Sequence, residues 1–259
     1  MTQEDETFTA VYAVPMHCSG CSSTVEGVLQ SLPGYQSAVS DLTNQTVSLT
    51  SSTPPSVVVR ALRERAGKDA IVRGAGIGGA NGSGAAVAIL ESFDTVSGED
   101  KKVLGLVRLV SVGQRKTLFD ISLSGEKGFL EDTPGTTYYA NIRKSGDISQ
   151  GAFSTGGVLH FLSKLTVALT GSGSAAPKPP AVPSFWGQAY VTKNDLAIDE
   201  LIGRSITVTK NSEETVARDT LVGVIARSAG VWQNDKTVCS CSGKTVWEER
   251  KDAIDRGVL

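Results

Sequence analysis

Two closely spaced pairs of cysteines are the strongest chemical signal in this 259-residue sequence. Cys18 and Cys21 have two residues between them, and Cys239 and Cys241 have one. Closely paired thiols in a reducing compartment indicate metal or redox chemistry, whereas a disulfide-dense secreted scaffold needs more cysteines than these. We therefore expect both pairs to do chemistry rather than to hold the fold together.

The first pair precedes a predicted helix. Alternating apolar residues over Phe8–Val14 predict a strand, and helical spacing of apolar residues over Ser22–Leu32 predicts a helix. Cys21 would then lie at a helix N-terminus, where the helix dipole favours a thiolate. Two soft thiolates suit Cu(I), which accepts low coordination. We therefore predict a Cu(I) site at Cys18 and Cys21, with Lys68 offsetting the negative charge.

Other interpretations of the first pair stay open. The spacing also occurs in thioredoxin-type redox pairs and in one half of a structural zinc site. Zinc normally takes four ligands, so a Cys₄ site would have to join the two pairs from opposite ends of the chain. Of the neighbouring residues, we expect His17 to be exposed and Met16 to pack in the core, rather than either to be a ligand.

The composition excludes several classes of function. With only two histidines, His17 and His160, one chain cannot build a His₃ catalytic zinc site or a copper site made mainly of imidazoles. The 25 basic and 27 acidic residues leave a formal charge of −2, which argues against broad binding of nucleic acid or anionic membranes. No apolar run approaches a membrane span, and the acidic first residues do not resemble a secretory signal. We therefore expect a cytoplasmic protein.

Glycine and proline divide the chain into segments. Residues 1–73 show the order βαββαβ, the ferredoxin-like plan of an α+β domain. The Gly-rich stretch 74–84 is expected to be a linker. Residues 85–227 hold short strand candidates between turn signals and predict an all-β sandwich or barrel, interrupted by a Pro-rich loop over 171–184. Residues 228–259 are expected to form a C-terminal tail around the second cysteine pair.

The first pair and its setting resemble a known domain. Met16, Cys18 and Cys21 form the pattern Met-x-Cys-x-x-Cys in the loop before the first helix. This pattern, with the βαββαβ order around it, resembles the heavy-metal-associated domain of copper metallochaperones over residues 8–73. The resemblance implies that the first domain carries copper.

The C-terminal part extends the resemblance to nearly the whole chain. Gly223–Trp232, the Cys239-Ser-Cys241 motif and Thr245–Lys251 resemble the corresponding region of the copper chaperones for superoxide dismutase, fungal type. This resemblance implies Cu(I) as the cargo and Cu/Zn superoxide dismutase as the partner.

The same resemblance implies a Greek-key barrel of the Cu/Zn superoxide dismutase type in the middle domain. Tyr139–Asp147 resembles the enzyme's copper-binding segment, but Asn141 and Arg143 stand where histidines are expected. Only His160 remains in a ligand-like segment. The resemblance therefore implies a barrel that recognises the partner, without dismutase activity and without zinc.

The family's interface elements imply a set of partner-binding residues in two segments of the barrel. The implied set is Ile202, Gly203, Arg204, Val224, Ile225 and Arg227. Because side chains alternate along a strand, some of these must instead point into the core. The expected assembly is a heterodimer with the dismutase, and a homodimer of this chain is the alternative.

The expected mechanism has three steps. Cys18 and Cys21 carry Cu(I), the barrel docks on the immature dismutase, and Cys239 and Cys241 act on the target. The second pair would relay copper, exchange a disulfide with the target, or do both. We therefore expect a metallochaperone rather than an enzyme, in the cytoplasm and also in the mitochondrial intermembrane space. A thiol–disulfide oxidoreductase and a copper carrier for another client are the alternatives.

Overall fold

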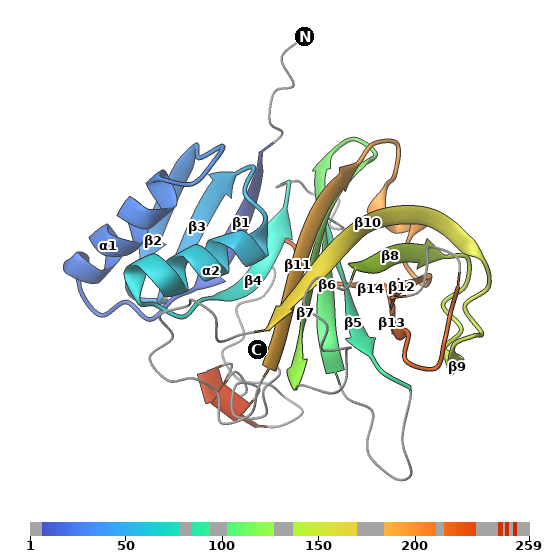
Figure 1. Ribbon diagram of the computed structural model, residues 1–259. Coiled ribbons are helices and arrows are strands. Elements are labelled where there is room, and N and C mark those ends of the chain that lie inside the picture. Colours follow the sequence, from blue (N-terminus) through green and yellow to red (C-terminus); the bar gives the residue numbers. More distant parts are fainter. Residues whose placement is uncertain are drawn as a thin grey trace.

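The computed structural model consists of an αβ domain and a β-barrel that lie side by side (Figure 1). It describes residues 7–77, 84–93, 103–126, 137–169, 184–210, 215–231, 243–245, 247–248 and 251–252. Within these residues, no helix is both long and apolar enough to cross a bilayer. A ferredoxin-like domain followed by a barrel confirms the predicted fold class.

The first domain is an antiparallel sheet with two helices on one face (Figure 1). Its elements are β1 (Phe8–Ala13), α1 (Ser19–Gln30), β2 (Ser37–Asp41), β3 (Thr46–Ser51), α2 (Pro55–Ala66) and β4 (Ile71–Gly76). The strands lie in the order β2-β3-β1-β4, which confirms the βαββαβ plan. Apolar residues at helical spacing, including Leu29 of α1 and Leu62 of α2, are fully buried in the core of this domain.

Helix α2 begins and ends at residues that suit those positions. Pro55 lies in the first turn, where its missing N–H would have had no partner within the helix. Gly67 follows the helix with a φ of 60°, a left-handed conformation that glycine adopts without strain. The backbone N–H of Lys68 then donates to the carbonyl oxygen of Leu62 at 3.1 Å, which closes the helix end.

Strand β4 is longer than the sequence predicts. It continues through Gly76, three residues into the segment 74–84 that is predicted to be linker. A side chain at Gly74 would meet the carbonyl oxygen of Gly230 at 2.1 Å, so glycine lets the C-terminal segment pass against β4. Residues 78–83 lie outside the described residues.

The second domain is an antiparallel barrel. Its strands are β5 (Ala85–Glu91), β6 (Val103–Gly113), β7 (Lys116–Glu126), β8 (Thr137–Arg143), β9 (Ser149–Ala152), β10 (Val158–Leu169), β11 (Ser184–Lys193), β12 (Ser205–Thr209), β13 (Leu221–Val224) and β14 (Ala226–Arg227). The order is β13-β12-β8-β10-β11-β7-β6-β5, and a pairing of β13 with β5 closes the ring. Inward residues such as Phe119 and Ile121 are fully buried and fill the interior.

Strands β9 and β11 were not among the strands that the sequence predicts. β11 is paired with β7 along its whole length, from Ser184 opposite Glu126 to Lys193 opposite Thr117. Its centre reads Gly187-Gln188-Ala189, which breaks the alternation of large apolar and polar residues. Residues 184–193 therefore form a strand because they pair with β7, and not because of their own sequence pattern.

Candidate metal centre and partner surface

The first cysteine pair lies where strand β1 passes into helix α1. Cys18 is the last extended residue before the helix, and its carbonyl oxygen accepts the backbone N–H groups of Cys21 and Ser22, at 3.0 and 3.3 Å. This first turn brings the two Sγ atoms to 3.5 Å from each other. Cys18 is exposed and Cys21 is half-buried, and both are free thiols. The geometry offers two adjacent sulfurs to a soft cation approaching from solvent.

The surroundings of Cys21 favour its thiolate. Backbone hydrogen bonding from His17 lowers the pKa of the Cys21 thiol most, and the Cys18 side chain and the Lys68 charge lower it further. The N-terminus of α1 adds its partial positive charge, and no acidic residue lies in the first turn to cancel it. A thiolate is the form of cysteine that binds metals and that attacks disulfides. These contacts therefore favour both metal binding and thiol–disulfide exchange.

Neighbouring residues lie as the sequence predicts. Met16 is fully buried in the core of the first domain, so it packs rather than ligates. His17 is exposed, and its Nδ1 lies 3.2 Å from Nε2 of Gln45. Within the described part of the chain, no group of three or more His, Cys, Asp or Glu side chains could hold a metal ion.

The second cysteine pair, Cys239 and Cys241, lies outside the described residues. Described residues beyond it include a reciprocal helix cap. The backbone N–H of Thr245 donates to Oε2 of Glu248 at 2.7 Å, and the N–H of Glu248 donates to the Thr245 hydroxyl at 3.2 Å. This capping box starts the short helical turn that contains Trp247.

At one end of the barrel, an arginine occupies the region that the resemblance compares with a copper site. Arg143 is buried, and its guanidinium donates to the Thr155 hydroxyl at 3.1 Å and to the Gly156 carbonyl oxygen. Asn141, two residues earlier on β8, is fully buried, whereas His160 on β10 is exposed. Asparagine and arginine side chains are therefore buried at the two compared positions of β8, and the histidine of the neighbouring strand is exposed to solvent.

The two segments predicted to bind the partner lie side by side. Gly203 donates its N–H to the Ile225 carbonyl oxygen at 3.0 Å, and Ile225 donates its N–H to the Arg204 carbonyl oxygen at 2.8 Å. Gly203 and Arg227 are exposed, while Ile202 and Val224 are half-buried. These four are the members of the predicted set whose side chains or backbone are at least partly exposed and that make no contact described below.

Two members of the predicted set have other contacts. Ile225 is 1% exposed and packs in the barrel core, so its side chain cannot reach a partner. Strand alternation turns it inward. Arg204 donates from Nε to the Glu200 carbonyl oxygen at 2.9 Å and from Nη1 to the Lys144 carbonyl oxygen at 2.8 Å. Its guanidinium therefore holds loops together.

Sequence reasoning missed one exposed aromatic residue near this surface. Phe153 follows β9 directly and is 56% exposed. β9 in turn contacts β13, which carries Val224. The signal available in the sequence was an aromatic residue within a Gly- and Ser-rich segment.

Comparisons with known proteins agree with this geometry. Residues 11–69 match the Heavy-metal-associated domain family. The chain is 42% identical to the Superoxide dismutase 1 copper chaperone of Debaryomyces hansenii, with 98% of each chain covered. It is 40% identical to the protein of that name from Saccharomyces cerevisiae, with 100% of each covered. The Copper chaperone for superoxide dismutase of Sus scrofa is 32% identical over 94% of this chain and 89% of its own.

These relatives are named as chaperones and not as enzymes, which agrees with the expectation of a non-enzymatic metallochaperone. The similarity spans the thiol loop, the barrel and the tail rather than the first domain alone. The chain therefore belongs to the family of copper chaperones for superoxide dismutase.

Proposed function

We propose that this protein carries Cu(I) on Cys18 and Cys21 and delivers it to immature Cu/Zn superoxide dismutase. The observation that carries the proposal is the pair of free sulfurs 3.5 Å apart at the start of α1. Cu(I) accepts two soft ligands, so the pair can hold the ion without further protein groups. Because Cys18 is exposed, an incoming thiolate can replace it and take the ion without releasing it to solvent.

The proposed partner surface is the end of the barrel formed by Ile202, Gly203, Val224 and Arg227. Phe153 on the neighbouring loop would add an apolar anchor. Exposed aromatic and aliphatic side chains beside an arginine match the usual composition of a protein interface. The assembly is a heterodimer with one dismutase subunit, and without that partner the same face would join two copies of this chain.

Cys239 and Cys241 are the proposed groups that act on the target. One residue between two thiols favours a strained disulfide, and strained disulfides exchange readily. As a disulfide, the pair would accept two electrons from two target thiols and leave the target with its intrasubunit disulfide. Molecular oxygen would then take those two electrons together with two protons, forming hydrogen peroxide, and restore the disulfide of the pair. As thiols, the pair would pass Cu(I) onward.

A reconstitution tests the proposal. Protein loaded with Cu(I) is mixed in air with reduced, zinc-loaded, copper-free dismutase, in the presence of a strong Cu(I) chelator. Dismutase activity and the target disulfide, seen on a non-reducing gel, are followed together. We expect both to appear with the intact protein. Cys18→Ser/Cys21→Ser should lose copper delivery, and Cys239→Ser/Cys241→Ser should lose disulfide formation.

A second experiment tests the surface. Val224→Glu places a charge on the proposed interface, and sedimentation velocity with the dismutase should then show loss of the heterodimer. Val39→Glu is the matched control, because Val39 is 65% exposed on β2 of the first domain. Equal binding by both variants would contradict the assigned surface.

The outcomes also separate the alternatives. Copper bound at Cys18 and Cys21, with neither activity nor disulfide in the dismutase, would indicate a carrier for another client. Disulfide formation in unrelated substrates without copper would indicate a general oxidoreductase. Residence in the cytoplasm, with a second pool in the mitochondrial intermembrane space, is part of the proposal and is checked by fractionation.

A further inference from the structure

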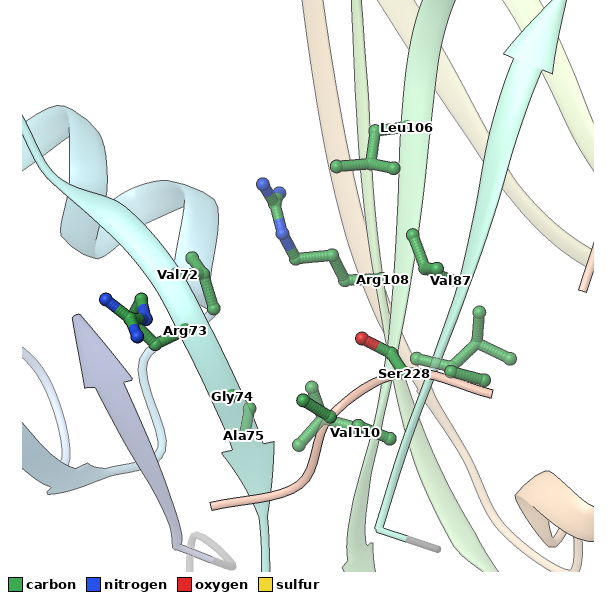
Figure 2. A pocket seen from close by; sticks show the side chains of 13 residues that line it. Val72, Arg73, Gly74, Ala75, Val87, Leu106, Arg108, Val110 and Ser228 are labelled. Atoms are coloured by element: carbon green, nitrogen blue, oxygen red, sulfur yellow. The ribbon is translucent and has the colours of Figure 1, made fainter. Parts of the chain in front are cut away.

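The outer face of the barrel is apolar where it meets the first domain. Strands with one solvated face normally place polar residues on it. On β6 and β7, however, Val110, Val112 and Leu118 point outward and are buried in the core cluster of the first domain. Figure 2 shows Val110 on the barrel side of the seam, near Gly74 and Ala75 of β4. This face of the barrel therefore requires a cover.

A buried carboxylate lies on the same face. Asp120 of β7 is fully buried, and its Oδ2 accepts the backbone N–H of Ser56 at 2.8 Å. Its Oδ1 accepts the Ser56 hydroxyl. Ser56 lies in the first turn of α2, where backbone N–H groups have no partner within the helix. Pro54, at the N-cap, has no side-chain oxygen, so Asp120 supplies the missing cap from the other domain.

A glutamine extends this contact. Gln188 of β11 donates from Nε2 to the Ser56 hydroxyl, and its Oε1 accepts Nη1 of Arg60 at 3.0 Å. Arg60 is one helical turn after Ser56, so the barrel touches α2 at two successive turns. Asp120 and Gln188 thus recognise the exposed backbone and side chains at the start of one helix.

The Asp120 carboxylate has a basic residue and hydrogen-bond donors of the protein around it. Arg108 stands directly opposite Asp120 on β6. Burial raises the pKa of the Asp120 carboxyl, while Arg108 and the hydrogen bonds from Ser56 oppose that rise. Arg108 also extends into a groove of about 260 Å³ between β4 and the barrel (Figure 2). The seam between the domains therefore contains a specific polar arrangement within apolar contacts.

We propose that the outer face of β6, β7 and β11 is a docking surface for the thiol-bearing domain of the same chain, and that Asp120 latches that domain by capping α2. Each domain is built around a hydrophobic cluster, and Val110, Val112 and Leu118 of the barrel join the cluster of the first domain. The partner that this surface fits is a helix N-terminus flanked by apolar residues.

The docked position has a defined place on the barrel. From β7, the strand β12 is reached through β11, β10 and β8 in one direction and through β6, β5 and β13 in the other. The thiol-bearing domain is therefore held on the side of the ring opposite the surface of Gly203 and Val224, as Figure 1 shows.

Residual dipolar couplings of the full-length apo protein test the latch. If the domains are docked, one alignment tensor fits the backbone amides of both. Asp120→Ala removes the cap from the barrel side, and Ser56→Ala removes the hydroxyl from the helix side. In each variant we expect the first domain to move relative to the barrel. Its couplings should then indicate a lower degree of alignment, and a separate alignment tensor should be needed for each domain. The double variant should be little worse than Asp120→Ala, because both changes break the same contact.

Asp147→Asn is the matched control, because Asp147 also accepts a backbone N–H, from Ser149 at 2.9 Å, but within the barrel. It should keep one tensor. Two tensors in the unaltered protein would overturn the docking, and one tensor in Asp120→Ala would overturn the latch. If Asp120→Ala fails to fold, Ser56→Ala decides alone, since it leaves the barrel sequence untouched. No copper is needed, so the outcome is independent of the proposed function.

Discussion

The loop of Cys18 and Cys21 and the barrel end around Arg143 differ in which polar groups a ligand could reach. In the loop, two free thiols lie 3.5 Å apart, with Cys18 exposed and Cys21 half-buried. In the barrel, a buried guanidinium already donates to the oxygens of Thr155 and Gly156. A site for a transferable ion needs accessible donors held close together, and a site already filled by a side chain becomes part of the fold. The thiol loop thus offers donors to a ligand, whereas the arginine at the barrel end is part of the fold.

The largest effect should come from the loop. Cys18→Ser/Cys21→Ser removes both soft ligands, so Cu(I) affinity should fall by more than the roughly 100-fold that loss of a group merely supporting a ligand costs. Competition with a chromogenic Cu(I) chelator measures it. His17→Ala is the control, because His17 is exposed beside the pair and should leave affinity nearly unchanged. An equal loss of Cu(I) affinity in both variants would contradict the assignment of the site to the two thiols.

The barrel end should respond in stability instead. Arg143→Ala leaves the buried Thr155 hydroxyl and the Gly156 carbonyl oxygen without this donor, so the free energy of unfolding should fall by about 1–3 kcal/mol. Urea unfolding followed by fluorescence measures this. Arg227→Ala, at an exposed arginine of the same domain, should change stability by less than about 0.5 kcal/mol. A gain of tight metal binding in Arg143→Ala would show that the barrel end is a suppressed metal site after all.

The pH dependence of thiol reactivity tests whether the loop lowers the pKa of Cys21. The pKa of Cys21 is lowered, so its thiolate persists below the pH at which an ordinary cysteine is protonated. In the apo protein, the alkylation rate at Cys21 should stay high as pH falls from alkaline values and should decline only through the lowered pKa. Mass spectrometry of each peptide after iodoacetamide pulses measures the profile. A profile matching that of a free cysteine peptide would contradict the assignment.

The smallest effect should come from Lys68. The Lys68 charge lowers the pKa of Cys21 less than the His17 hydrogen bond does, so Lys68→Met should move the alkylation profile only slightly towards higher pH. Lys116→Met, in the barrel, is the control and should leave the profile in place. A large shift from Lys68→Met would mean that the loop depends on charge rather than on backbone geometry.

Local pattern predicted most of the first domain. Alternation over Phe8–Val14 and helical spacing over Ser22–Leu32 place the thiol loop between β1 and α1 as expected, because these are short-range signals. β11 escaped prediction because its register is set by β7, a partner far away in the chain. Strand pairing of this kind depends on tertiary contacts that no window of sequence contains.

Asp120 shows a limit of a different kind. An acidic residue within the apolar run Thr117–Leu123 was visible in the sequence. Its partner, the first turn of α2, belongs to another domain, and neither segment alone indicates the other. The thiol pair could be predicted because both ligands lie in one turn, whereas the contact of Asp120 with Ser56 joins distant segments.

The close approach of Gly74 and Gly230 sets a length scale for the tail. The backbone of Ser228 is tied to β5 through the Ala85 carbonyl oxygen at 3.1 Å, and Gly230 is buried against β4. Cys239 comes nine residues after Gly230, so a fully extended chain would carry it no farther than about 30 Å from that anchor. Any thiol that reacts with Cys239 must come within this radius, which makes the seam between the two domains the centre of the tail's working range.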